Sequence, residues 1–441
     1  MNQQVTEKVQ FDVMVIGGGI AGCESALNLA NVGYKVVLVE KDLSIGGKMI
    51  LLSKVFPTLD CAACITTPKV SEIMRHPNIT VWTSAQAESI KQLDDGSFYA
   101  QVLQQPRYVK IDDCTGCQLC EDACPVSVVD EYQFGLIGRK AAFIPFSIAS
   151  PRVAAIDIDN CTLCGACERV CPTDAIDFTQ KPILYQVSAR AVIIATGFQL
   201  FDPTVMPRYG YGKYKNVLTS MQMERQLAPT RPFNTVLRPS DGKIPDNIAY
   251  VLCTGSRDHT VGNPICSRVC CMYSMKQAQL ILGALPMADV TLYYIDIRAF
   301  GKGFNQFYRQ AKAMGVEFVK GKVAKITEKD NGNLILRYED INDGGVVKEA
   351  EHDLVVLSVG ILPNRGIERL FVNRKLQLDE YNYVAQPNVL LNPAQTSIPG
   401  VFVAGVASGP MDIPDSILSA GAASSEAAKY IKQLETKTVT V

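Results

Sequence analysis

The chain has 441 residues, of which 47% are hydrophobic and 20% are charged, and its formal net charge is −1. This length and composition predict an ordinary globular protein with a sizeable core and two or three domains. The balanced charge and the lack of basic runs argue against a protein built to bind nucleic acid.

The N-terminal residues and the cysteine content predict a compartment. Residues 1–11 lack the apolar core of a signal peptide, and no stretch approaches the ~20 uninterrupted apolar residues of a membrane helix. The chain has 15 cysteines, most of them in metal-ligand spacings. We therefore expect a protein of the reducing cytoplasm, associated with a membrane only through partner subunits.

The first predicted elements form a dinucleotide-binding unit. In chain order they are a strand at 11–16, the glycines Gly17, Gly19 and Gly22, a helix at 20–32, and a strand at 35–39 that ends in Glu40. Glycines in this G-x-G-x-x-G spacing let the backbone turn against a pyrophosphate and let the helix pack on the strand. The helix N-terminus stabilises negative charge, and the terminal acid can accept a hydrogen bond from a ribose hydroxyl.

Three later segments extend this unit: SIGGK at 44–48, Ala195-Thr196-Gly197 after a strand at 191–194, and Gly405 after a strand at 399–404, with a helix at 416–434. With the N-terminal fingerprint they resemble the two-dinucleotide-domain flavoproteins of the thioredoxin reductase type, where such segments surround FAD. That superfamily usually has aspartate after the last glycine. Here Val406 follows, so we expect Asp412 and Asp415 to supply polar contacts. The predicted FAD-binding residues are Gly17, Gly19, Gly22, Glu40, Lys41, Gly46, Gly47, Lys48, Ala195, Thr196, Gly197, Gly405, Asp412 and Asp415.

A C-x-x-C pair, Cys61 and Cys64, follows the sequence FPTLD. Such a pair can be a redox-active dithiol or disulfide, two ligands of a cluster completed elsewhere, or two packed cysteines. No third cysteine lies nearby in the sequence, and the spacing does not choose among these alternatives.

The next segment carries two copies of the pattern C-x2-C-x2-C-x3-C-P. In bacterial-type ferredoxins this spacing holds two [4Fe–4S] clusters, and the fourth cysteine of each run binds the other cluster. The predicted ligand sets are Cys114, Cys117, Cys120 and Cys171 for one cluster, and Cys124, Cys161, Cys164 and Cys167 for the other. Disulfides would need an oxidising compartment, and structural zinc usually shows two C-x-x-C pairs, so both are weaker interpretations.

The second half of the chain predicts another α/β unit, with strands at 248–252 and 290–295, a helix at 304–314, and strands near 316, 334 and 353–359. A pyridine-nucleotide fingerprint would follow the first strand, but the chain has Cys253-Thr254-Gly255 there, so we expect no NAD(P)H site. A third thiol set consists of Cys253, Cys266, Cys270 and Cys271. By spacing alone it can hold a [4Fe–4S] cluster, hold zinc, or combine two reactive thiols with two buried ones.

Several motifs together resemble one family: FPTLDCAAC, TGSRD, NPICSRVCCMYSMKQA, YYIDIRAFG and AGVASGPMDIPDS. In these motifs the chain resembles the A subunit of heterodisulfide reductase and its relatives, including the A subunit of the quinone-interacting oxidoreductase complex of sulfate reducers. The resemblance implies that the third thiol set binds a [4Fe–4S] cluster close to FAD. It also implies that Lys276 is a catalytic residue near the flavin N5 edge, the alternative being a surface lysine on a helix.

The expected fold class is α/β: a two-dinucleotide-binding-domain flavoprotein of the thioredoxin reductase type with an inserted two-cluster [4Fe–4S] ferredoxin domain. The predicted divisions are a first FAD-binding part at 1–105, the ferredoxin domain at 106–185, a second FAD-binding part with a linker at 186–245, a second Rossmann-like domain at 246–365, and a third FAD-binding part at 366–441. The isolated His76, His259 and His352 are interpreted as ordinary surface or core residues.

The resemblance implies an FAD and iron–sulfur electron-transfer subunit with three [4Fe–4S] clusters, in a heterodisulfide-reductase-like complex that could bifurcate or confurcate electrons. Its partners would be B-like and C-like iron–sulfur subunits, a membrane quinone-reactive subunit, or a hydrogenase or dehydrogenase module, around a homodimeric core. The methanogen A subunit carries extra terminal cluster domains without counterparts in this sequence, so we expect the shortened relatives to be the better guide. A free-standing flavin disulfide oxidoreductase using Cys61 and Cys64 is the alternative.

Overall fold

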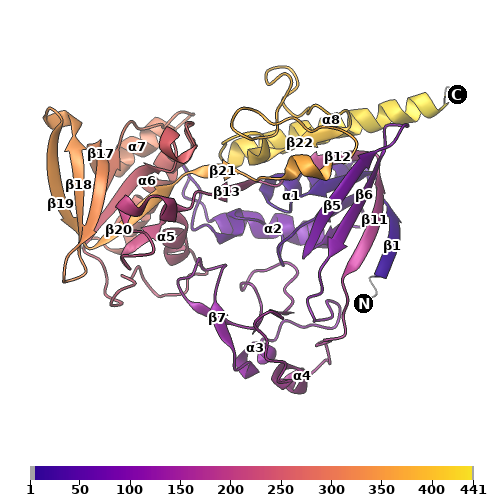
Figure 1. Cartoon of the computed structure of the whole chain (residues 1–441), viewed down its shortest axis with the longest axis horizontal. Helices are drawn as coiled ribbons and strands as arrows, with labels where there is room; N and C mark the ends of the chain where they lie inside the picture. The colour runs from indigo at the N-terminus through magenta and orange to yellow at the C-terminus, as the bar shows by residue number, and fades with distance from the viewer. Residues whose placement is uncertain (1–4, 440–441) are drawn as a thin grey trace.

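The computed structural model describes residues 5–439, and its parts can be followed in Figure 1. A parallel sheet and a smaller sheet lie on the right, a larger sheet lies on the left, and an inserted segment lies below. The long helix α8 (Ile413–Val439) runs along the top of the right-hand part. No helix in the described residues is long and apolar enough to cross a membrane.

The first sheet is parallel, and its strands in spatial order are β22 (Val401–Val403), β12 (Ala191–Ile194), β2 (Val13–Ile16), β3 (Val36–Val39) and β4 (Ile79–Trp82). All residues of the first four of these strands are buried, as expected for a parallel sheet covered on both faces. Helices α1 (Ile20–Asn31), α2 (Ala62–Arg75) and α8 share a core with one face. Strands β2, β3, β12 and β22 and helices α1 and α8 lie where the sequence predicts them.

A smaller sheet covers the opposite face, in the order β1 (Val5–Gln10), β11 (Ile183–Ala189), β6 (Phe98–Gln104) and β5 (Ala85–Gln92). Strands β6 and β11 pair antiparallel, with Gln104 opposite Ile183. The chain therefore leaves this sheet at the end of β6 and returns at the neighbouring strand end.

The segment between β6 and β11 is the insertion. Its elements are α3 (Leu119–Ala123), β7 (Ser127–Val129), β8 (Gly138–Lys140), β9 (Ala142–Phe143), β10 (Ala155–Ile156) and α4 (Ala166–Val170). Its apolar core includes Ile50 and Leu51 from the turn η1 (Met49–Leu51) of the parent unit. The insertion is therefore packed onto the first unit.

The second large sheet has the order β14 (Val217–Thr219), β20 (Leu354–Val359), β15 (Asn247–Thr254), β16 (Asp289–Tyr294), β17 (Glu317–Glu328), β18 (Leu334–Asp340) and β19 (Val346–His352). Pairing is parallel from β14 to β17 and antiparallel beyond it. Helices α5 (Ser220–Leu227), α6 (Cys270–Ala284) and α7 (Phe304–Ala313) accompany it. The sequence did not predict the edge strand β14 in the 186–245 segment, because its three residues are too few to show a period.

A short antiparallel ribbon of β13 (Phe198–Leu200) and β21 (Ile361–Pro363) connects the two large sheets. The remaining 3₁₀ turns are η2 (Pro203–Val205), η3 (Pro207–Tyr209), η4 (His259–Val261), η5 (Ile341–Asp343), η6 (Ile367–Leu370) and η7 (Gly405–Ser408).

Candidate functional site

Glycines form the crossing from β2 to α1. At two of these positions no larger residue would fit. Gly17 has φ +106°, and a Cβ there would lie 2.4 Å from the Ala195 carbonyl oxygen. A Cβ on Gly22 would lie 1.8 Å from the Gly17 carbonyl oxygen. A Cβ on Gly19 would have open space, and no side chain caps the helix that begins beside it. This leaves backbone N–H groups and room at the helix N-terminus, which suits a pyrophosphate.

The predicted ribose acceptor Glu40 is buried at the end of β3, with 6% of its surface exposed. Its carboxylate accepts hydrogen bonds from Gly18 N at 2.6 Å and from Asp42 N at 2.9 Å. Burial raises its pKa, opposed by these two backbone bonds. Of the two nearby lysines, Lys41 is exposed, whereas Lys48 donates to the Phe198 carbonyl at 2.7 Å and has a pKa lowered by burial.

The 43–46 loop accepts hydrogen bonds from, and donates them to, residues of other segments that the sequence did not predict as site residues. Arg107, which is buried, donates to the Leu43 carbonyl and to Thr83 Oγ1. Burial lowers the pKa of this guanidinium to about 10. Ser150 of the insertion donates its N–H to Ser44 Oγ at 2.9 Å and accepts from Ile45 N at 3.0 Å. The insertion thus bonds directly to the predicted nucleotide loop, which contains Gly46 and Gly47.

The two other predicted contact segments lie beside the glycine crossing. Ala195 packs on Gly17, and the Thr196 carbonyl accepts from Asn364 Nδ2 at 2.5 Å. Gly197 has φ +68° and open space at its Cβ position. A Cβ on Gly405 would lie 2.7 Å from the Ala21 Cβ, so this turn needs glycine for close packing on α1.

The aspartates expected to replace the missing acid have protein partners in this structure. Asp412 caps α8 by accepting from Asp415 N at 2.9 Å, and its pKa is raised by burial. The Asp415 carboxylate pairs with Arg268 at 3.0 Å. Arg268 in turn donates its backbone N–H to Cys266 Sγ at 3.3 Å, so these contacts connect the start of α8 to the third thiol set.

Two hollows in the insertion are each lined by one predicted set of four thiols. The first hollow contains Cys114, Cys117, Cys120 and Cys171, and the second contains Cys124, Cys161, Cys164 and Cys167. Apolar side chains complete both walls, with Val109, Ile144 and Ile176 in the first and Ala142, Ile156 and Phe178 in the second. Among residues 5–439, no group of three or more His, Cys, Asp or Glu residues is placed to hold a single metal ion. Four thiols around an apolar hollow suit a [4Fe–4S] cluster, whose thiolates bind separate iron atoms.

The third thiol set is also brought together. Cys253 lies near the end of β15 with φ +58°, and Cys270 and Cys271 are the first residues of α6. The Cys270 thiol lies close enough to Cys253 and Cys271 for both of them to raise its pKa. The contact with Cys270, and next the charge of Arg257, lower the pKa of Cys253 to about 7 against the effect of burial. Cys271 Sγ lies 3.7 Å from the Asp296 carbonyl oxygen.

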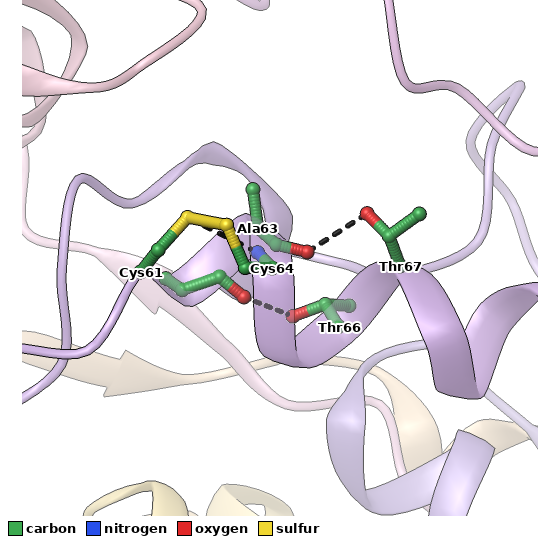
Figure 2. The surroundings of a disulfide bond; sticks show 6 residues. Cys61, Ala63, Cys64, Thr66 and Thr67 are labelled. Atoms are coloured by element: carbon green, nitrogen blue, oxygen red, sulfur yellow. Dashed lines mark hydrogen bonds between the residues drawn. A yellow bond between two sulfur atoms is a disulfide. The ribbon is translucent and has the colours of Figure 1, made fainter.

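Cys61 and Cys64 form a disulfide, with 5.2 Å between their Cα atoms (Figure 2). Cys61 is the N-cap of α2, and its sulfur accepts a hydrogen bond from Cys64 N at 3.2 Å. Cys64 is exposed. Of the three alternatives that the spacing left open, the structure contains the disulfide.

Lys276 is 1% exposed, so the alternative of a surface lysine is wrong. Its ammonium pairs with Glu224 and donates to the Lys54 carbonyl at 2.9 Å. The same carboxylate accepts from Ser53 N at 2.8 Å, Ser53 Oγ at 2.6 Å and Gln277 Nε2 at 2.5 Å. A role for Lys276 beside flavin N5 stays a prediction.

The residue after Glu224, Arg225, is fully buried and extends this network to the insertion. It donates to Gln133 Oε1 at 3.0 Å and to the Leu51 carbonyl at 2.6 Å. Helix α5 therefore contacts the first unit, the insertion and α6 through two adjacent residues. Sequence reasoning missed both, because a charged pair on a short helix is typical of a solvated surface.

Comparisons with known proteins agree with this architecture. The pyridine nucleotide-disulphide oxidoreductase family matches residues 11–427. Thioredoxin reductases from T. acidophilum and Lactococcus lactis share the fold, with TM-scores of 0.53 and 0.54, at 15% and 14% identity. Each comparison covers 96% of this chain and 99% of the reductase.

Curated relatives share far more sequence, and three of them are A subunits from methanogens. The chain is 42% identical to the A subunit of the H(2):CoB-CoM heterodisulfide,ferredoxin reductase of Methanothermobacter marburgensis, over 96% of this chain and 64% of the relative. It is 43% identical to the iron-sulfur A subunit of the CoB–CoM heterodisulfide reductase of Methanocaldococcus jannaschii, over 96% and 64%. For the A subunit of the ferredoxin:CoB-CoM heterodisulfide reductase of Methanosarcina mazei the values are 41%, 96% and 53%.

This chain thus spans between half and two thirds of the length of these relatives. The match to each of them nevertheless extends over nearly the whole chain, including the insertion. The chain belongs to the pyridine nucleotide-disulphide oxidoreductase family, and A subunits of heterodisulfide reductase are similar to it over nearly its whole length.

Proposed function

We propose that the chain is an FAD and iron–sulfur electron-transfer subunit of a heterodisulfide-reductase-like complex. The observation that carries this proposal is the pair of hollows in the insertion, each lined by four thiols. The segment that carries them bonds to the predicted nucleotide loop through Ser150. An electron carrier on the insertion would therefore lie on a segment that is anchored to the nucleotide site.

Each part of the chain has a distinct task in this proposal. When bound, FAD supplies one- and two-electron chemistry and the clusters supply one-electron steps. The glycine crossing would hold the pyrophosphate at the N-terminus of α1, and Glu40 would orient the ribose. The thiols of the two hollows and of the third set would be the ligands of three [4Fe–4S] clusters. Lys276 would place a cation, shared with Glu224, near the flavin.

The partners are also part of the proposal. The relatives include the A subunits of a ferredoxin:CoB-CoM heterodisulfide reductase and of an H(2):CoB-CoM heterodisulfide,ferredoxin reductase. We infer partner subunits of B and C type, or a quinone-reactive, hydrogenase or dehydrogenase module, around a homodimeric core. Bifurcation or confurcation would need an acceptor or donor supplied by those partners.

Anaerobic purification with cofactor counting tests the proposal. We expect flavin absorption and about 12 iron atoms per chain, because three clusters hold four each. Cys120→Ser should remove about four of them, whereas the matched Cys23→Ser, at a buried cysteine outside all three sets, should remove none. A chain purified without flavin or iron contradicts the proposal, and iron–sulfur subunits that co-purify with the tagged chain identify its partners.

The disulfide at Cys61 and Cys64 favours one second candidate, a free-standing flavin disulfide oxidoreductase. Its exposed Cys64 sulfur is accessible to a small thiol. This candidate predicts disulfide reduction by the purified chain alone, lost when either cysteine becomes serine. Turnover only in the presence of partner subunits would reject it.

A further inference from the structure

Arginines surround the third thiol set. Cys253 and Arg257 line the same hollow, and the guanidinium lies close enough for its positive charge to act on the Cys253 sulfur. The Arg298 charge acts on Cys266, whereas Cys271 interacts with the Arg298 backbone. Neither arginine belongs to a predicted ligand set, and the proposed electron path does not use them.

Arg257 is fixed in place rather than free to move. Its NH1 pairs with Asp296 Oδ1 at 2.5 Å, and its backbone N–H donates to the Ile265 carbonyl at 2.9 Å. Only 23% of its side chain is exposed. The salt bridge therefore holds the guanidinium beside the hollow that Cys253 also lines.

The backbone around this contact is in an uncommon conformation. Cys253, Arg257 and Arg268 have φ of +58°, +56° and +60°, in the left-handed region that non-glycine residues seldom enter. Residues held there cost on the order of 1–3 kcal/mol each and are retained where the surrounding structure requires them. All three positions contact the third set or contribute to it. The loop thus keeps both a thiol and an arginine at strained positions that bring them together.

We propose that Arg257 is a positioning residue of the third thiol set, and that its positive charge beside Cys253 raises the reduction potential of the [4Fe–4S] cluster held there. This inference rests on the proposed function. A cluster gains one negative charge on reduction, and a guanidinium beside a ligand sulfur stabilises that charge. Hydrogen bonds to ligand sulfurs and nearby charge are the ways in which a protein sets such potentials.

An EPR-monitored redox titration of the full-length, cofactor-loaded chain tests the inference. The signal lost in Cys270→Ser identifies the third cluster. Arg257→Gln should make that cluster harder to reduce, with at least a tenfold lower ratio of reduced to oxidised cluster at fixed potential, equal to about 59 mV for one electron. Arg257→Lys keeps the charge without the fork of donors and should give a smaller shift. The control Arg208→Gln should give none, because this guanidinium pairs with Asp258 at 3.2 Å instead.

Asp296→Asn is the second variant if Arg257→Gln does not fold, and it should shift the same signal because it releases the guanidinium from its anchor. An unchanged third-cluster potential in Arg257→Gln, or the same shift in Arg208→Gln, overturns the inference while leaving the proposed function intact. A wild-type chain with only about eight iron atoms lacks the third cluster, and then this part of the proposed function and the inference both fail.

Discussion

In the two large sheets the chain passes from a central strand to the next helix in contrasting ways. After β2 the chain turns through Gly17, Gly18 and Gly19 and begins a helix at once. After β15 it follows residues 255–269 before α6 begins at Cys270. The connection from β2 to α1 leaves the backbone uncovered because its glycines have no side chains. The connection from β15 to α6 is instead filled by thiols and arginines. The connection between a parallel strand and the next helix can therefore present bare backbone to one ligand and side chains to another.

The largest effect should come from adding one methyl group to the first crossing. A Cβ on Gly22 would meet the Gly17 carbonyl oxygen at 1.8 Å, and neither backbone segment can retreat. We expect Gly22→Ala to abolish flavin binding and to lower the free energy of unfolding by about 4 kcal/mol or more. Gly19→Ala is the matched control, because a Cβ at this position has open space. This variant should keep the stability of the wild type and should lose only its affinity for flavin. Equal stability of both variants, measured by urea unfolding, would contradict the packing argument.

In the second unit, a large loss of stability should come from a buried charge that loses its partner. Glu224→Ala leaves the Lys276 ammonium buried without its carboxylate, which costs about 3–5 kcal/mol. The double variant Glu224→Met, Lys276→Met leaves no charge unpaired and should recover most of that loss. Denaturant unfolding of the wild type, the single variant and the double variant measures this. If the single and double variants are equally unstable, the lost packing matters more than the unpaired charge.

The stability of the second large sheet should depend on pH through His352, which lies at the end of β19. Burial lowers its pKa from 6.5 to about 4, and its ring bonds to Tyr293 OH at 2.9 Å and Asn247 Oδ1 at 2.6 Å. Below pH 6.5 the unfolded chain binds a proton that the folded chain refuses until about pH 4. Stability should therefore fall as the pH drops through this window, by up to about 3 kcal/mol. His352→Gln should flatten this dependence, and His259→Gln, at an exposed site, should not.

The smallest effect should come from the disulfide at the start of α2. Under oxidising conditions, replacing Cys61 and Cys64 together by serine should cost about 2 kcal/mol, because the bond closes only a short loop. Reduced wild-type protein should be about as stable as the double variant, which serves as the internal control. Iron and flavin contents should not change. A loss of iron in the double variant would make these cysteines cluster ligands and give the two units a shared cofactor.

Much of the fold follows from local patterns. The buried strands β2, β3, β12 and β20 are nearly uninterrupted apolar runs, and the glycine spacing after β2 marks its turn. The ferredoxin spacing repeats within one segment, so its two sets of four cysteines could be written down from the sequence, and the same sets line the two hollows.

The parts that escaped prediction depend on pairs distant in the chain. Glu224 and Lys276 are separated by 52 positions, and each alone is typical of a helix surface. Asp415 meets Arg268 from 147 positions away, so a carboxylate expected at the cofactor has a protein partner instead. Arg257 belongs to a loop in which several left-handed residues are not glycines, and no sequence pattern announces such strain.

The pairing register of β6 and β11 fixes where the insertion leaves and rejoins the parent sheet. Gln104 and Ile183 stand opposite one another at the two ends of the insertion, as the arms of a hairpin would. When two strands pair in this way, a long loop between them costs only slightly more closure entropy than a short loop. A short hairpin turn could therefore replace the whole insertion, or a different domain could be grafted at this position, while the parent sheet keeps its pairing. In evolutionary terms, the inserted segment can be exchanged without a change in the sheet that carries it.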